Sequence, residues 1–181
     1  ATVMIRTASG EWIIEHAWHE PKSTSFGHSV DLSEGTLVIG AGSHAREVWI
    51  AAHNMDKGEW SDLIHVDVPE SGANGFVGWD VAVHVDEDGD GLMVISEFDD
   101  EPKEKSSACA VHLYWINGLE ATHFQVLSPP GVQNSEFGRA VDTNGSIVVV
   151  GSPQEIPKDW EVPTGEVVIY KWVQANQSYQ I

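Results

Sequence analysis

The feature that most constrains the fold of this chain is an internal repeat, spaced by roughly 50 to 60 residues, which is the range of propeller blades. Each copy is opened by a phenylalanine, namely Phe26, Phe76 or Phe137, and two of the three continue directly with glycine. A short apolar strand led by glycine follows in each copy, at residues 35–40, 91–96 and 145–151. Because such repeats bury their apolar faces by stacking, the chain is expected to be a row of equivalent small sheets.

Each copy holds enough strands for one four-stranded antiparallel sheet. An alternating strand follows the glycine-led one, at residues 47–50, 110–115 and 166–172, and a fourth apolar segment follows in turn, for example at 60–66 and 123–127. Asn144-Gly145 and Glu34-Gly35 stand where tight hairpin turns are needed. No long segment with a 3.6-residue apolar period competes, so we predict an all-β propeller fold with almost no helix. The continuous apolar run at 147–150 predicts a strand covered on both faces.

The repeats divide residues 1–181 into one propeller segment of about three and a half blades, fewer than the roughly 4 to 8 of a closed propeller. The predicted units are a half blade at 1–25 and blades at 26–75, 76–136 and 137–181. An open stack exposes blade faces and strand edges. We therefore expect a piece of a longer propeller, closure by a second copy, or a larger assembly that covers the open sides.

The repeated motif resembles the FG-GAP repeats of integrin alpha-type ectodomains. The first copy carries it as Phe-Gly-x-Ser-Val at 26–30, Gly-Thr-Leu-Val-Ile-Gly-Ala at 35–41, a third strand at 48–50 and then Trp60. The third copy matches the motif almost as well, whereas the second copy keeps only the order of elements. Together the three copies extend the resemblance over nearly the whole chain. It implies a propeller used for recognition, in a secreted, cell-surface or organelle-lumen protein, and it names no ligand.

The charge of the chain limits its partners. It has 9 Lys and Arg against 28 Asp and Glu, a formal net charge of −19. That field repels nucleic acid and anionic lipid and attracts divalent cations and basic protein surfaces, although it also serves solubility alone. The single cysteine, Cys109, cannot form an internal disulfide, and there is no paired-cysteine zinc motif.

The sharpest candidate site is the acidic turn at 86–91, where Asp86, Asp88 and Asp90 stand at alternate positions beside glycines. Carboxylates so spaced around a tight turn can converge on Ca²⁺. The turn resembles the calcium hairpins of some FG-GAP blades, but those carry another acidic residue three positions after the last glycine, where this chain has Val94. An acidic turn without a metal is the alternative interpretation.

A second acidic cluster follows in the predicted loop after the second strand of the middle copy, and loops of this kind often form contact surfaces. We predict a protein contact there, with a simple solvated loop as the alternative; its residues are Glu97, Asp99, Asp100 and Glu101. Five tryptophans could form a sugar-stacking surface or, more simply, pack between blades: Trp18, Trp49, Trp79, Trp115 and Trp172.

These features favour a non-catalytic protein-binding or scaffold module, as an ectodomain or a structural subunit of a complex. No nucleophile elbow, phosphate loop or paired nucleophile and base motif is visible in the sequence. The alternatives are a calcium- or carbohydrate-binding lectin-like propeller and, third, an enzyme with its site in the central channel. The predicted partner is a protein, or a second copy that completes the propeller.

Overall fold

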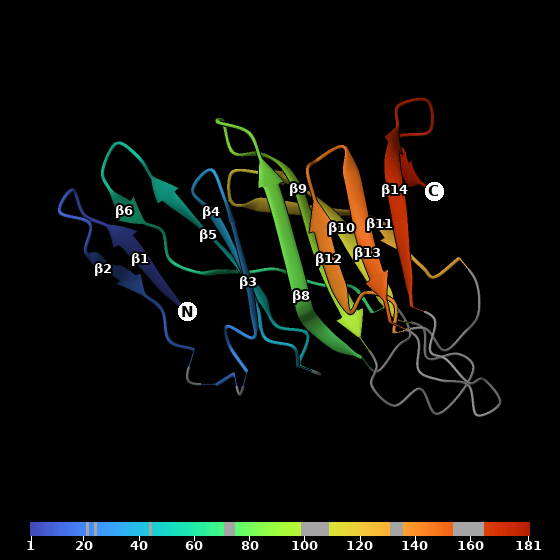
Figure 1. Ribbon diagram of the computed structural model, residues 1–181, viewed down its shortest axis with the longest axis horizontal. Coiled ribbons are helices and arrows are strands. Elements are labelled where there is room, and N and C mark those ends of the chain that lie inside the picture. Colours follow the sequence, from blue (N-terminus) through green and yellow to red (C-terminus); the bar gives the residue numbers. More distant parts are fainter. Residues whose placement is uncertain are drawn as a thin grey trace.

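The computed structural model consists of antiparallel β-sheets that follow one another in chain order (Figure 1). It describes residues 1–20, 22, 23, 25–43, 45–70, 75–98, 109–130, 136–153 and 165–181. Within these ranges every regular element is a strand, as the turn-rich sequence predicted. In the same part of the chain, no helix long and apolar enough to span a bilayer is found.

The first two sheets occupy the N-terminal third of the chain. Sheet I is a single hairpin of two strands, β1 (Thr2–Arg6) and β2 (Trp12–Ala17). Sheet II has the order β3-β4-β5-β6, and β7 also pairs with β5, so two short strands share the place of the predicted fourth strand. Its strands are β3 (Ser29–Ser33), β4 (Thr36–Gly40), β5 (Val48–Asn54), β6 (Glu59–Trp60) and β7 (Ile64–His65).

The next two sheets each have four strands in sequential order, which is a meander. Sheet III comprises β8 (Phe76–Val85), β9 (Asp90–Phe98), β10 (Ala110–Asn117) and β11 (Glu120–Leu127). Sheet IV comprises β12 (Ala140–Thr143), β13 (Ile147–Ser152), β14 (Glu166–Val173) and β15 (Ser178–Gln180). The prediction of several four-stranded antiparallel sheets is therefore confirmed.

Two hairpin turns show why the strands end where they do. Glu34 and Gly35 both have positive φ, 42° and 82°, which is the twist that a two-residue hairpin requires. In the β12–β13 turn Gly145 has positive φ but Asn144 does not, and the Asn144 side chain instead accepts N–H bonds from Ser146 and Ile147 at 3.1 and 2.9 Å. Local turn chemistry thus sets the register of β3 with β4 and of β12 with β13.

The sheets pack face to face, and the core lies between them in three clusters. The cluster between sheets I and II includes Trp18 and Trp49. The cluster between sheets II and III includes Ile50 and Val83, and the cluster between sheets III and IV includes Leu113 and Tyr170. Sheet III is therefore covered on both faces, which fits its two long hairpins and its large buried side chains.

The sheets form an open row, with the N-terminus beside sheet I and the C-terminus beside sheet IV, at opposite sides of the molecule (Figure 1). The strands of each sheet fall inside one of the predicted units. A closed ring is not formed by the described residues, so the finer prediction of a propeller is taken up below as a proposal.

The middle repeat begins one residue later than the sequence alignment suggested. The glycine with positive φ that opens each four-stranded unit is Gly27, Gly78 or Gly138, at 85°, 69° and 86°. The residue before Gly78 is Val77, which is fully buried, so Val77 and not Phe76 occupies the place of Phe26 and Phe137. Strand β8 also has a register shift between Val77 and Val81, next to this glycine.

Candidate functional site

The first strands of sheets II, III and IV, which are β3, β8 and β12, lie side by side and are linked by two hydrogen bonds of the same kind. Asp31 Oδ2 of β3 accepts the N–H of Val83 in β8 at 2.7 Å. Asp80 Oδ2 of β8 in turn accepts the N–H of Val141 in β12 at 2.8 Å. The edge of each following sheet is thus completed by a carboxylate of the sheet before it, which satisfies N–H groups that no strand pairs.

The surroundings of the Asp80 carboxyl group disfavour its ionised form. Burial raises its pKa, and the neighbouring charges of Asp31 and Asp142 add to the rise. The N–H groups of Val141 and Val81 bind the carboxylate and act in the opposite direction. Asp31, Asp80 and Asp142 therefore lie along the first strands of three successive sheets, and Asp31 and Asp80 each bind the backbone of the sheet that follows.

Sheet IV repeats the same surface on its exposed side. Asp142 has the position of Asp31, four residues after the positive-φ glycine. Both use Oδ1 to accept the N–H of the next residue, Leu32 at 2.9 Å and Thr143 at 2.8 Å. Asp31 uses its Oδ2 atom to bind the following sheet. Among the described residues, the Oδ2 atom of Asp142 accepts no hydrogen bond.

The third strand of sheet IV shows the clearest difference from its equivalents. The register matches Val167 with Val48 of sheet II and Val111 of sheet III, since each lies opposite the end of its second strand. Val48 and Val111 are fully buried by the sheet that follows, whereas Val167 is 65% exposed. The next inward residue repeats the contrast: Ile50 and Leu113 are fully buried, and Ile169 is 48% exposed.

We call this surface the sheet IV face, defined by Asp142, Ile147, Val149, Val167 and Ile169. It is apolar at its centre and bears one carboxylate, that of Asp142, on the first strand of the sheet, β12. Its residues occupy positions that contact the next sheet in sheets II and III, but in sheet IV they are accessible to solvent.

The opposite end of the row is also open. In β3, Val30 and Leu32 are more than half exposed, whereas Val81 and Val83, their equivalents in β8, are buried against sheet II. Sheet I adds further exposed apolar side chains, which are Met4, Ile5, Trp12, Ile13 and Ile14. Clusters of this size are typical of surfaces that another protein covers.

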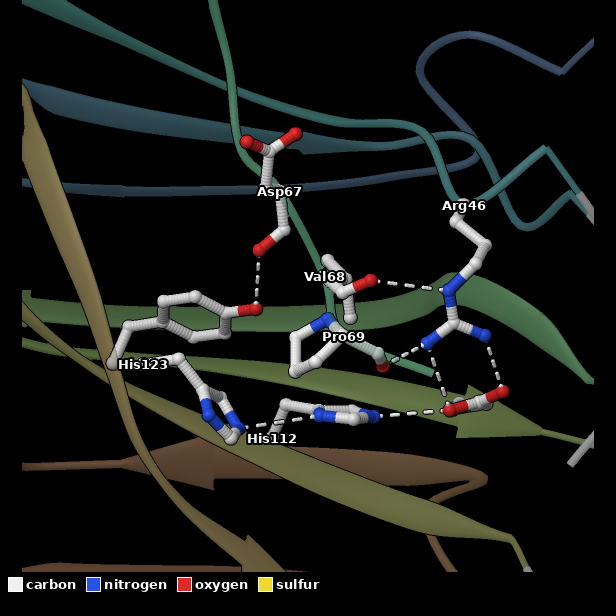
Figure 2. A network of polar contacts seen from close by, with 8 residues as sticks. Arg46, Asp67, Val68, Pro69, His112 and His123 are labelled. Atoms are coloured by element: carbon white, nitrogen blue, oxygen red, sulfur yellow. Dashed lines mark hydrogen bonds and ion pairs between the residues drawn. The ribbon is translucent and has the colours of Figure 1, made fainter. Parts of the chain in front are cut away.

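A second polar feature, between sheets II and III, is a buried network centred on Glu97 (Figure 2). Arg46, in the β4–β5 loop, donates from Nη1 to Glu97 Oε1 at 2.7 Å and from Nη2 to Oε2 at 3.3 Å. The guanidinium also donates to the carbonyl oxygens of Val68, at 3.1 Å, and Pro69. Arg46 therefore ties its own loop, the segment after β7 and strand β9 together.

The network continues through two histidines on β10 and β11. His112, fully buried, places Nε2 at 3.0 Å from Glu97 Oε2. Because the Arg46-paired carboxylate accepts hydrogen bonds only, Nε2 of His112 carries a hydrogen, and in the neutral imidazole Nδ1 then carries the lone pair. That Nδ1 lies 3.4 Å from Nε2 of His123.

The surroundings of His123 lower its pKa. Burial is the larger cause, and the neighbouring His112 is the second. Tyr114 packs edge-on to His123, with ring centroids 5.0 Å apart, and donates from its hydroxyl to the carbonyl oxygen of Asp67 at 2.9 Å. Burial also raises the pKa of Tyr114, so the phenol stays neutral and remains a donor.

The acidic contact cluster predicted from the sequence is corrected in one residue. Glu97 is not part of a loop: it lies in β9, has no exposed surface and binds Arg46 and His112. A side chain so placed cannot touch a partner, so the predicted contact at Glu97 is wrong. Asp99, Asp100 and Glu101 lie outside the described residues.

The predicted calcium turn connects β8 and β9. Asp86 Oδ1 accepts the N–H groups of Asp88 and Asp90, each at 3.0 Å, so this carboxylate holds the turn in shape. Gly89 supplies the positive φ, 84°. No three His, Cys, Asp or Glu side chains are grouped to hold a metal ion in the part of the chain that the structure describes. Calcium binding at Asp86, Asp88 and Asp90 stays a prediction.

The tryptophans divide between packing and surface. Trp18 and Trp49 are buried in the cluster between sheets I and II. Trp115 is partly exposed, stacks on Phe124 with ring centroids 4.4 Å apart and meets Trp172 edge-on at 5.1 Å. Trp79 is packed against the core between sheets III and IV, under the guanidinium of Arg139. Contacts between aromatic rings thus account for the positions of these five side chains.

No protein-family model matches this sequence. The search of curated proteins finds no similar protein either. The resemblance to FG-GAP repeats therefore stands on the motifs of the chain itself.

Proposed function

We propose that this chain is a non-catalytic protein-binding or scaffold module, a segment of a β-propeller whose open ends accept further β-sheet. The partner is another antiparallel sheet, from a second copy or from another protein, that docks on the sheet IV face. Its first strand places a backbone N–H on Asp142 Oδ2, as β8 does on Asp31 and β12 on Asp80.

One observation carries this proposal: Val167 and Ile169 are exposed at positions that are fully buried in both preceding sheets. Full burial of a Val or Ile side chain stabilises a contact by about 1.5–3 kcal/mol. Two such residues, with the apolar side chains beside them, give an interface core, and Asp142 supplies a directed polar contact at its rim. The exposed side chains of sheet I and β3 offer an apolar surface at the other end.

The experiment is sedimentation of the chain over a concentration series, with the double variant V167D/I169D. We expect the chain to form dimers or larger assemblies as concentration rises, and the double variant to remain monomeric because two carboxylates cannot be buried in an apolar contact. Met55, exposed at the β5–β6 turn, gives the control variant M55D, which should associate like the unchanged chain. Association that is the same in all three proteins contradicts the proposal, and a chain that is monomeric throughout excludes a second copy as the partner.

Calorimetry separates this proposal from the lectin-like alternative. Heat and a thermal shift on adding Ca²⁺, both lost in Asp88→Ala, would favour a metal-dependent binding module in its place. A response to Ca²⁺ that Asp88→Ala leaves unchanged assigns the ion to another part of this acidic surface.

A further inference from the structure

The two histidines at the end of the buried network have the geometry of a chelating pair. His112 Nδ1 and His123 Nε2 are 3.4 Å apart, which is long for a hydrogen bond, since N–H donors usually lie about 2.7–3.2 Å from their acceptors. Two nitrogens bound to one tetrahedral zinc ion at about 2.0–2.1 Å are about 3.3–3.4 Å apart. The separation therefore matches two ligands of one ion.

The surroundings of His112 are those of a metal-binding histidine. Ligating imidazoles commonly donate their second N–H to a carboxylate, which fixes the tautomer and raises the basicity of the free nitrogen. Glu97 accepts from Nε2 of His112 at 3.0 Å and is itself held by Arg46 (Figure 2). The lone pair of Nδ1 is thus fixed in direction before any ion arrives.

An ion can reach this pair from the His123 side. His112 is fully buried, but His123, on the outer strand β11, is only partly buried. The pairing of Arg46 with Glu97 leaves the network close to neutral, and the formal charge of −19 draws cations to the molecule. The described residues supply two ligands here, so water must fill the remaining positions.

We propose that His112 Nδ1 and His123 Nε2 bind one divalent transition-metal ion, of the Zn²⁺ or Cu²⁺ class, with Glu97 as the residue that positions His112. This site is independent of the sheet IV face. Imidazole nitrogens favour these ions over Ca²⁺ and Mg²⁺, which take oxygen ligands.

The test is titration calorimetry of the metal-free chain with ZnCl₂, comparing the unchanged chain with His123→Ala and Glu97→Gln. We expect one ion per chain, with binding at least ~10-fold weaker in His123→Ala and ~10–100-fold weaker in Glu97→Gln, as for other residues behind a metal ligand. His65→Ala is the matched control: His65 is exposed, 3.6 Å from Asp67, and its loss should leave zinc affinity unchanged. Zinc affinity that is equal in His123→Ala and the unchanged chain, or no zinc binding, overturns the proposal.

Electron paramagnetic resonance of bound Cu²⁺ gives a second measurement that needs no variant to fold. Two imidazole nitrogens on the copper of the unchanged chain support the site. Copper bound by oxygen alone overturns it.

Discussion

Glu97 is a carboxylate without exposed surface, and its partners decide whether the region between sheets II and III is stable. An ionised carboxylate in a protein interior costs several kcal/mol unless it is paired and hydrogen-bonded. Arg46 supplies two bonds and His112 a third, and Arg46 lies 51 positions away in the sequence. This one residue therefore links a loop of sheet II to two strands of sheet III.

Removing the arginine should be costly. Arg46→Met leaves Glu97 buried without its cation, and we expect the free energy of unfolding to fall by about 3–5 kcal/mol. Denaturant unfolding measures this, with Arg6→Met, at an exposed arginine, as the control that changes stability by less than about 0.5 kcal/mol. The double variant R46M/E97Q should recover part of the loss because the unpaired charge is gone. A cost below about 1 kcal/mol for Arg46→Met would show that the pair is not buried as described.

Asp80 gives a prediction with a defined pH dependence. Its pKa in the folded chain is raised above the ordinary value of 3.8, which is the pKa in the unfolded chain. Ionisation of Asp80 therefore destabilises the fold as pH rises through the folded pKa. At pH values below both the folded and the unfolded pKa, the group is protonated in both states and has no effect. Asp80→Asn removes the charge but keeps an oxygen that can accept the N–H of Val141. We expect the variant to be more stable than the unchanged chain at pH 7 and equally stable near pH 3. Thermal unfolding at the two pH values measures this, and lower stability at both contradicts it.

Single residues were the least predictable scale. Glu97 begins an acidic run in the sequence, so its charge suggested a loop, while the arginine that neutralises it is distant along the chain. The sequence gives no sign of the contacts of His112, because alternation along a strand tells which face a side chain takes but not which side chain it meets there. A buried charge pair that crosses two sheets leaves no local pattern to detect.

At the scale of strands and turns, local chemistry determines most of the structure. Gly35 and Gly145 supply positive φ at the two predicted turns, and alternating apolar residues form strands. Two expectations at this scale were wrong. The middle repeat is displaced by one residue, because a valine, Val77, and not a phenylalanine precedes its positive-φ glycine. The run at 147–150 is fully buried on one face only, because no described sheet covers the face of Val149.

The contact between β8 and sheet II depends on a glycine. Gly78 has a φ of 69°, and a methyl group there would lie 2.9 Å from Gly40 Cα and 3.0 Å from Val48. We expect Gly78→Ala to cost about 3 kcal/mol, since backbone strain of about 1–2 kcal/mol adds to overpacking of about 1–3 kcal/mol. Gly58 is the matched control, because its φ is 65° but nothing lies within 4 Å, so Gly58→Ala should cost only about 1 kcal/mol. Equal losses in denaturant unfolding would show that the close approach at Gly78 does not matter.

At the scale of the whole molecule, stability should vary along the row of sheets. Sheet III is covered on both faces, and sheet II is covered fully on one face and partly on the other. Sheet IV is covered on one face only, and sheet I is a two-stranded hairpin with many exposed side chains. The repeat in the sequence was enough to predict this succession of sheets. It held no information on what covers the two ends, because no described sheet lies against them.

Amide hydrogen exchange can measure this gradient. We expect β9 and β10 of sheet III to exchange slowest, at rates set by global unfolding, and β1 and β2 of sheet I to exchange fastest by local opening. Equal protection of β1 and β10 would contradict this prediction, because it would mean that sheet I is held as firmly as sheet III.

In the bond from the Val83 N–H to Asp31 and in the bond from the Val141 N–H to Asp80, the acceptor lies in the earlier sheet and the donor lies in the sheet made after it. During synthesis a finished sheet therefore presents its acceptors before the donors exist, and each new sheet finds a surface already prepared. Such a chain can assemble from its amino end as it leaves the ribosome, in steps no longer than one repeat.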